Sequence, residues 1–180
     1  GGETARFALA VSVDVGARYE TPAQGGISHL LEHMAFKGTA RRNARQIAEA
    51  FDMIGGQSNA YTGMEQTVYH AKVLKDDVAV AIDILADILQ HSVFDEAELA
   101  REREVVLQEI AMHYDAPDDL IFDYFDATAF PDQPMGRPIL GSEEQVASYR
   151  RDLEAAAEAI DDVCVAVGDY IQIYRELGVD

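Results

Sequence analysis

The sequence predicts an α+β fold with a mainly antiparallel sheet and helices packed on one side of it. Three observations support this class. Stretches of alternating polarity, typical of strands, occur near the N-terminus and again between residues 57 and 74. The two stretches between residues 57 and 74 are joined by a short turn, which predicts a hairpin, and the strands of a hairpin are antiparallel. Stretches with apolar residues at intervals of three and four, typical of helices, fill most of the remaining chain.

Strands are expected where polar and apolar residues alternate. These stretches are residues 7–15, 57–61 and 66–74. In the first stretch every odd-numbered residue is apolar, which predicts a strand with one strongly buried face. The other two flank Gly63 and should form the hairpin. The apolar run at 163–168 could be a short strand or a continuation of the helix before it, and we favour the strand.

Helices are expected where apolar residues recur on one face. These stretches are residues 27–36, 44–54, 78–90, 95–113, 119–129 and 143–160. Gly38 and Gly55 should end the first two. Asp95 should cap the fourth, with Glu98 completing a capping box. No repeat or interdomain linker is evident, so residues 1–180 are predicted to form a single domain.

Composition bounds the class of protein. A chain of 180 residues with 48% apolar content can build one substantial core, and it has no run long enough to span a membrane. A formal charge of −19 argues against nucleic acid and against anionic membrane surfaces as partners. It is compatible with a basic peptide, although we favour an ordinary solvated surface because the acidic residues are scattered. The single Cys164 excludes an intrachain disulfide and fits a reducing compartment.

The most informative segment reads His29-Leu30-Leu31-Glu32-His33. Residues four apart share one face of a helix, so His29 and His33 can reach one metal ion. Neutral imidazoles are common zinc ligands, and Glu32 is placed to act as a base toward water. The pattern is the inverted form of the HExxH zinc-protease motif. On its own it could also arise by chance on a polar helix.

Two histidines need a third ligand, because catalytic zinc usually takes three protein ligands and keeps one position open. Residues 101–109 offer several carboxylates. Glu102 and Glu109 are seven apart and lie on one helical face, whereas Glu104 points away from both. The residues alone leave the choice between Glu102 and Glu109 open.

Three segments together resemble the pitrilysin/insulinase family of zinc metallopeptidases: residues 29–39 (HLLEHMAFKGT), 59–67 (NAYTGMEQT) and 101–109. Within the family the chain is most similar to the branch of mitochondrial processing peptidase beta subunits and their bacterial relatives. The resemblance covers about residues 10–150 and implies a metallopeptidase half-clamshell domain that binds Zn²⁺ and cleaves extended peptides or presequences. It implies that Glu109, 76 positions after His33, is the third ligand.

The resemblance also implies roles for residues around the metal. Glu102 would be an auxiliary acid that supports the site, its alternative being a solvated surface carboxylate. Asn59 and Ala60 would lie on an exposed strand edge that captures an extended peptide by β-augmentation. Phe36 would line the pocket for the residue after the cleaved bond, although an ordinary core aromatic is an equal alternative. Two of the histidines outside the motif, His70 and His91, are expected to be ordinary residues.

Family members close two homologous domains or subunits around the peptide, which implies a second homologous domain or subunit as a partner besides the peptide substrate. Two functions stay open. The chain is a zinc metalloendopeptidase, or it is a non-catalytic or partner-dependent fragment that keeps the fold and binds zinc and peptide. The presence of all four motif residues favours catalysis. The chain starts without Met and without a secretory signal, so we treat its start as processed or truncated. We expect the bacterial cytoplasm, with the mitochondrial matrix as the alternative.

Overall fold

The computed structural model describes residues 5–149. Its main elements follow in chain order: β1 (Arg6–Val13), α1 (Ile27–Ala35), α2 (Ala44–Met53), β2 (Gln57–Thr62), β3 (Thr67–Leu74), α3 (Val78–Gln90), α4 (Glu96–Tyr114), α5 (Pro117–Ala129) and α6 (Glu143–Ser148). Short 3-10 turns complete the list: η1 (Ala17–Tyr19), η2 (Lys75–Asp77) and η3 (Pro134–Gly136). Each described element that the sequence predicts is present, with shifts at some ends.

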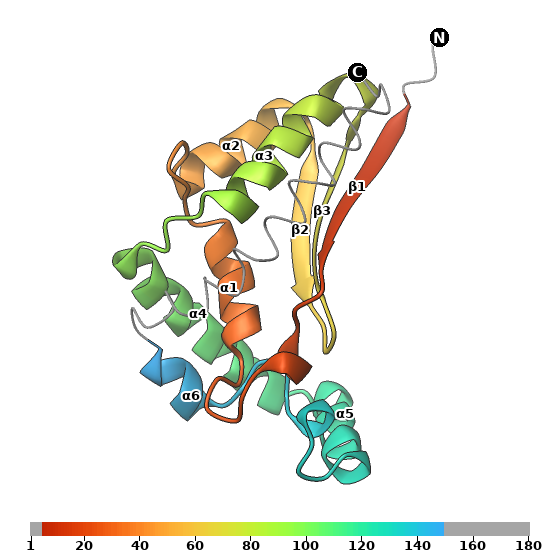
Figure 1. The fold of residues 1–180 in the computed structure, drawn as a ribbon, viewed down its shortest axis with the longest axis vertical. Helices are drawn as coiled ribbons and strands as arrows, with labels where there is room; N and C mark the ends of the chain where they lie inside the picture. Colours follow the sequence, from red (N-terminus) through yellow and green to blue (C-terminus); the bar gives the residue numbers. More distant parts are fainter. Residues whose placement is uncertain (1–4, 150–180) are drawn as a thin grey trace.

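The sheet of the described region is antiparallel, with strand order β1-β3-β2. β3 is central, and β2 lies at an edge. The hairpin between β2 and β3 closes as predicted, with the Gly63 N–H donating to the Gln66 carbonyl at 2.8 Å. Figure 1 shows α1, α2 and α3 on the same side of the sheet. This mixture of helices and antiparallel strands confirms the predicted α+β class.

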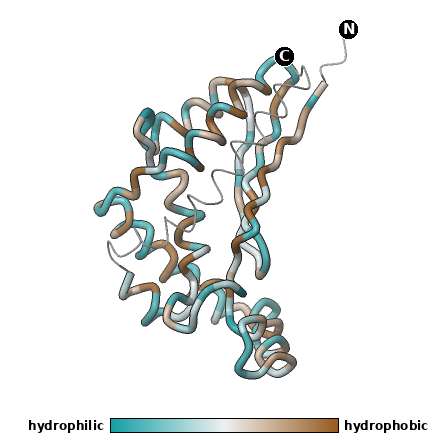
Figure 2. The backbone as a smooth tube through the Cα atoms, in the orientation of Figure 1, coloured by the Kyte–Doolittle hydropathy of each residue, from teal (hydrophilic) through white to brown (hydrophobic). Residues whose placement is uncertain are grey.

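Two hydrophobic clusters hold the helices in place. One lies between the sheet and helices α2 and α3, where Ile84 and Ile88 are almost fully buried. The other joins α1, α4 and α6 through Leu30, Val106 and Val146. Hydrophobic and hydrophilic segments alternate along these elements, as expected for elements with one buried face (Figure 2). Helix α1 therefore lies between the sheet and α4, in contact with both (Figure 1).

The strongly buried face predicted for the first strand is only partly present. The side chain of Phe7 is 42% exposed, burial increases along the strand, and full burial is reached only at Val13. The prediction was wrong in degree because the helices pack mainly on β2 and β3, which leaves the start of β1 uncovered. Alternation reports which face is apolar but not how far the helices reach across it.

The predicted helix over residues 143–160 ends early, at Ser148. Tyr149 has an extended backbone, because its hydroxyl donates to the Gly25 carbonyl and its own carbonyl accepts a hydrogen bond from Arg103. The strand expected at 163–168 lies outside the described residues.

The helix starts differ in two details from the prediction. Asp95 caps α4 as expected, but the reciprocal half of the capping box is not formed because Glu98 pairs with Arg101 instead. α5 begins at Pro117, a residue suited to the first turn of a helix, rather than at residue 119. No helix among residues 5–149 is long and apolar enough to cross a membrane.

Candidate metal centre

The start of α1 is fixed by a buried carboxylate. The Glu20 side chain accepts hydrogen bonds from the backbone N–H groups of Gly26 at 2.9 Å and Ser28 at 2.8 Å. These N–H groups have no partner within the helix, and a carboxylate suits the positive end of the helix dipole. Burial raises the pKa of Glu20, although the hydrogen bonds from Ser28 and Gly26 oppose the rise.

A close backbone approach adds a second constraint. Gly26 has φ +85°, and a Cβ there would lie 2.3 Å from the Leu140 carbonyl oxygen. The segment that approaches it is also tied to Glu20, whose backbone carbonyl accepts a hydrogen bond from Arg137 at 2.6 Å. The first turn of α1 is therefore placed by residues more than 100 positions away in sequence.

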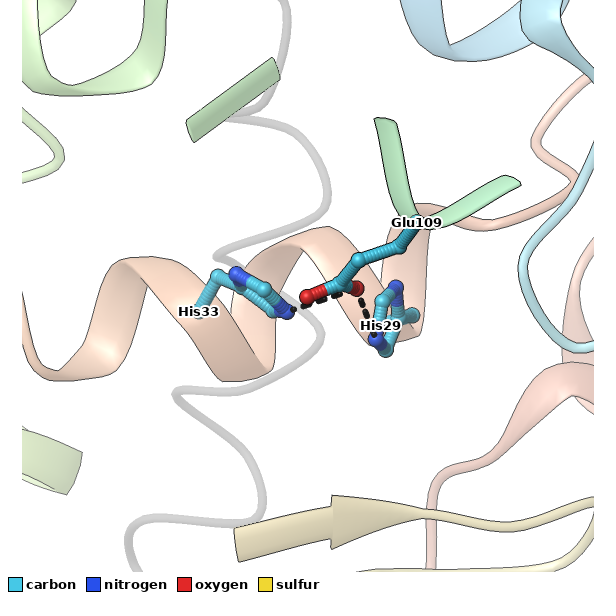
Figure 3. A group of neighbouring side chains, drawn as sticks. All are labelled: His29, His33 and Glu109. Carbon is cyan, nitrogen blue, oxygen red and sulfur yellow. Dashed lines mark ion pairs between the residues drawn. The ribbon is translucent and has the colours of Figure 1, made fainter. Parts of the chain in front are cut away.

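Three predicted ligands converge on one point. The Nε2 atoms of His29 and His33 each lie 3.5 Å from Oε2 of Glu109. The three donor atoms lie within 4.8 Å of one another. Figure 3 shows both imidazoles on α1, with the Glu109 carboxylate reaching toward them from α4. Among the described residues, these three form the group that could hold a metal ion.

The separation between Glu109 and each imidazole fits a tetrahedral zinc ion better than a direct hydrogen bond. Imidazole-to-carboxylate hydrogen bonds are usually about 2.7–3.2 Å long, shorter than the separations seen here. Two ligands at about 2.0–2.1 Å from a tetrahedral ion lie about 3.4 Å apart, close to the observed 3.5 Å. Burial, followed by the charge of His33, lowers the pKa of His29 to about 4. The imidazole of His29 is thus neutral near pH 7, in the form that metals bind.

Glu102 lies directly behind one of the imidazoles. Its Oε2 is 3.1 Å from Nδ1 of His33, and its Oε1 is 2.8 Å from Nζ of Lys37. The Glu102 side chain is only 8% exposed, so it is not a solvated surface carboxylate. Glu104, by contrast, is exposed, as its place on the helix predicts. A carboxylate at Nδ1 orients the ring and directs Nε2 toward Glu109.

Glu32 is held by a hydroxyl group from the sheet. The Thr62 Oγ1 donates a hydrogen bond of 2.5 Å to Oε2 of Glu32. Burial raises the pKa of Glu32, and the hydrogen bond from Thr62 opposes part of that rise. The charges of His33 and Glu109 also act on this carboxyl group. A partly buried carboxyl with a raised pKa, next to candidate metal ligands, is suited to accept and return a proton.

Lys37 and Thr62 were not predicted from the sequence to be functional residues. Lys37 lies four positions after His33, so helical spacing could have placed it on the same side of α1. Nothing local to Thr62 indicates its partner, because the two residues of the hydrogen bond are 30 positions apart. Only the packing of α1 on β2 brings them together.

The expected peptide-binding strand lies at an edge of the described sheet. Asn59 is exposed and Ala60 half-buried. The Ala60 N–H donates to the side-chain oxygen of Asn59 at 2.9 Å. An incoming peptide that pairs with this N–H must therefore displace the Asn59 carboxamide. A depression of about 610 Å³ beside α2 includes Asn59, His70 and Lys72 in its lining, and no candidate metal ligand lines it.

Phe36, His70 and His91 are not among the three residues of the metal cluster. Phe36 is half-buried, packs against the cluster between sheet and helices, and has its ring centre 6.1 Å from that of Tyr69. This packing is what the core-aromatic alternative describes, and pocket lining by Phe36 stays a prediction. His70 lies opposite Asn59 in the sheet, and His91 lies beside Asp87 with 3.5 Å between Nδ1 and Oδ1.

Comparisons with known proteins show which proteins this chain is similar to. The family model described as insulinase (peptidase family M16) matches residues 3–143. A protein from Rickettsia felis named as an uncharacterized zinc protease is 52% identical over 145 residues, which cover 81% of this chain and 35% of that protein. The probable mitochondrial-processing peptidase subunit beta of Arabidopsis thaliana is 46% identical over 144 residues, covering 80% of this chain and 27% of that protein.

A solved structure has the same fold. The crystal structure of a protease from Helicobacter pylori superposes with a TM-score of 0.78 and 26% identity, covering 82% of this chain and 36% of that one. The chain thus spans about a third of the length of the relatives that it matches.

Proposed function

Because this chain belongs to the insulinase family, peptidase family M16, we propose that it is the zinc-binding domain of a metalloendopeptidase acting on extended peptides or presequences. One observation carries the proposal. The Nε2 atoms of His29 and His33 each lie 3.5 Å from a carboxylate oxygen of Glu109, all three atoms lie within 4.8 Å of one another, and the carboxyl group of Glu32 lies in the same site. The names of the zinc-protease relatives support zinc as the metal.

The proposed reaction is hydrolysis of an amide bond, divided among the residues of this site. When bound to His29, His33 and Glu109, zinc would lower the pKa of a coordinated water and polarise the scissile carbonyl. Glu32 accepts a proton from the attacking water as the new carbon–oxygen bond forms. It then passes that proton to the leaving nitrogen as the carbon–nitrogen bond breaks. Glu102 keeps the His33 ring in its ligating orientation.

Peptide binding is assigned to β2, which lies at an edge of the sheet formed by residues 5–149. A chain laid along Asn59 and Ala60 would gain main-chain hydrogen bonds, which read the backbone rather than the side chains. We include a second homologous domain or subunit in the proposal, since the relatives are about three times as long as the matched segment. The relatives include bacterial proteins and one named as mitochondrial, so bacterial cytoplasm and mitochondrial matrix both stay predictions.

Two substitutions test the assignment. Glu32→Gln should retain zinc at wild-type stoichiometry but abolish cleavage of a basic, presequence-like peptide, because an amide cannot accept the proton. Glu109→Ala should instead lower the zinc content, since a ligand is lost. The exposed Glu104→Ala on the same helix is the matched control and should change neither quantity.

Each measurement is made with the chain alone and together with a candidate second subunit. Cleavage by Glu32→Gln at the wild-type rate would reject Glu32 as the base, and unchanged zinc stoichiometry in Glu109→Ala would remove Glu109 from the ligands. Zinc bound without turnover in both forms would favour the alternative, a non-catalytic fragment that binds zinc and peptide.

A further inference from the structure

We propose that Thr62 is a positioning residue that ties the base Glu32 to the strand carrying the peptide. The inference rests on the proposed function and deepens it, because it concerns how the base is held relative to the substrate. Thr62 is the last residue of β2, three positions after Asn59. Its hydroxyl donates to Oε2 of Glu32 at 2.5 Å.

A glutamate side chain needs such a partner to keep one orientation. The last torsion of Glu joins a tetrahedral carbon to a planar carboxylate, and it has a broad energy profile instead of three sharp wells. Helix α1 fixes the backbone of Glu32 but leaves that torsion free. A hydroxyl bound to one carboxylate oxygen selects the orientation of the other. The bond from Thr62 thus supplies an alignment that the helix cannot provide.

Thr62 is itself anchored on both sides of the hairpin. It lies opposite Thr67, which is 5% exposed and donates from Oγ1 to the Val15 carbonyl at 2.9 Å. The next residue, Gly63, accepts a hydrogen bond of 3.1 Å from the backbone of Ala17. The end of β2 is therefore held by hydrogen bonds to the segment that follows β1. These bonds fix the backbone that carries the hydroxyl of Thr62.

Strand β2 would therefore contact both the peptide, through Ala60, and the base Glu32, through Thr62. Ala60 and Thr62 are two residues apart, about 7 Å along an extended strand. A peptide paired with Ala60 would be placed relative to Glu32 by the backbone of one short strand. Small errors in the position of a catalytic group are costly, because a misplacement of about 1 Å can reduce the rate about 100-fold.

The test compares Thr62→Val, which keeps the shape and loses the hydroxyl, with Thr62→Ser, which keeps the hydroxyl. The assay uses whichever form of the wild-type protein cleaves the basic peptide, alone or with a second subunit. Thr62→Val should lower kcat about 10- to 100-fold, with KM and zinc stoichiometry within about twofold of wild type. Thr62→Ser should recover most of the loss. Thr128→Val on α5, where the hydroxyl bonds only to its own helix, should behave as wild type.

A second measurement is independent of turnover. In metal-free protein, Thr62→Val should lower the melting temperature when Glu32 is present and have a smaller effect in a Glu32→Ala background, because their contact is then already lost. An equal fall in melting temperature with Glu32 present and in the Glu32→Ala background would show that Thr62 and Glu32 do not interact, and would overturn the proposal. A wild-type kcat in Thr62→Val would overturn the positioning role alone. A wild-type protein that cleaves in neither form would overturn the proposed function, and this inference with it.

Discussion

Removing the carboxylate of Glu102 should weaken zinc binding while leaving the fold intact. This side chain is 8% exposed and joins His33 at 3.1 Å to Lys37 at 2.8 Å. Glu102→Gln keeps the volume and an oxygen that can accept the proton of Nδ1, but loses the negative charge. Glu102→Ala removes the acceptor altogether. The side chain of Lys37 is 30% exposed, so water can solvate its ammonium group once its partner is gone, and the folding cost stays small.

The expected magnitude follows from these contacts. Loss of a partner that orients a metal-binding histidine typically costs about 10- to 100-fold in affinity, which is about 1.4–2.7 kcal/mol. Glu102→Gln should lie near the lower limit because its amide oxygen can still hold the ring of His33. Glu102→Ala should lie near the upper limit, since the ring is then free to turn away from Glu109.

The assay is a competition titration of metal-free protein with Zn²⁺ and a chelating dye, at pH 7, with thermal unfolding recorded in parallel. Glu104→Gln is the matched control, because Glu104 is an exposed carboxylate on the same helix. Its zinc Kd should equal that of the wild type. If Glu102→Ala has the melting temperature of the wild type and binds zinc within twofold of the wild-type Kd, the carboxylate does not orient His33 and the reasoning is refuted.

Two further predictions concern stability. Burial favours the protonated form of Asp87, but hydrogen bonds from Arg41, Thr39 and Arg42 outweigh it and lower the pKa below the ordinary 3.8. The stabilisation is therefore complete well above pH 3.8 and is lost as the pH falls through the folded-state pKa. Asp87→Asn should lower the urea midpoint at pH 7, and a difference from wild type that fails to shrink below pH 3.8 would contradict the assignment. Gly26→Ala combines φ +85° with a Cβ 2.3 Å from a backbone oxygen and should lower the free energy of unfolding by about 3 kcal/mol. Gly55→Ala has φ +59° in open space and should lower it by only about 1 kcal/mol. Equal losses of unfolding free energy in urea would argue against the close approach at Gly26.

The elements of the fold were predictable because their signals are local. The apolar stripe of α2 and the alternation in β3 each report on residues within a few positions. The errors arose where distant contacts decide. The start of β1 is exposed because none of the helices within residues 5–149 packs over it, and α6 stops at Ser148 because Tyr149 bonds to Gly25 and Arg103 instead.

The candidate site divides in the same way. Helical periodicity is sufficient to place His29 and His33 side by side, and their ring centres lie 4.6 Å apart. The residues alone left Glu102 and Glu109 as equal candidates, and the family resemblance favoured Glu109. In the structure Oε2 of Glu109 faces both Nε2 atoms, while Glu102 lies behind His33. Their roles in binding zinc stay predictions.

The sequence by itself determined the class of fold and the shared helical face of His29 and His33, because both depend on short-range patterns of residues, and it determined the family through three separate segments. Only the tertiary structure decided which atoms meet around that face. Packing of α1 against α4 and β2 brings Glu109 and Thr62 to it, across 76 and 29 residues counted from His33. Such contacts depend on how whole elements dock. The spacing of residues within one element carries no information about the partner that arrives from another.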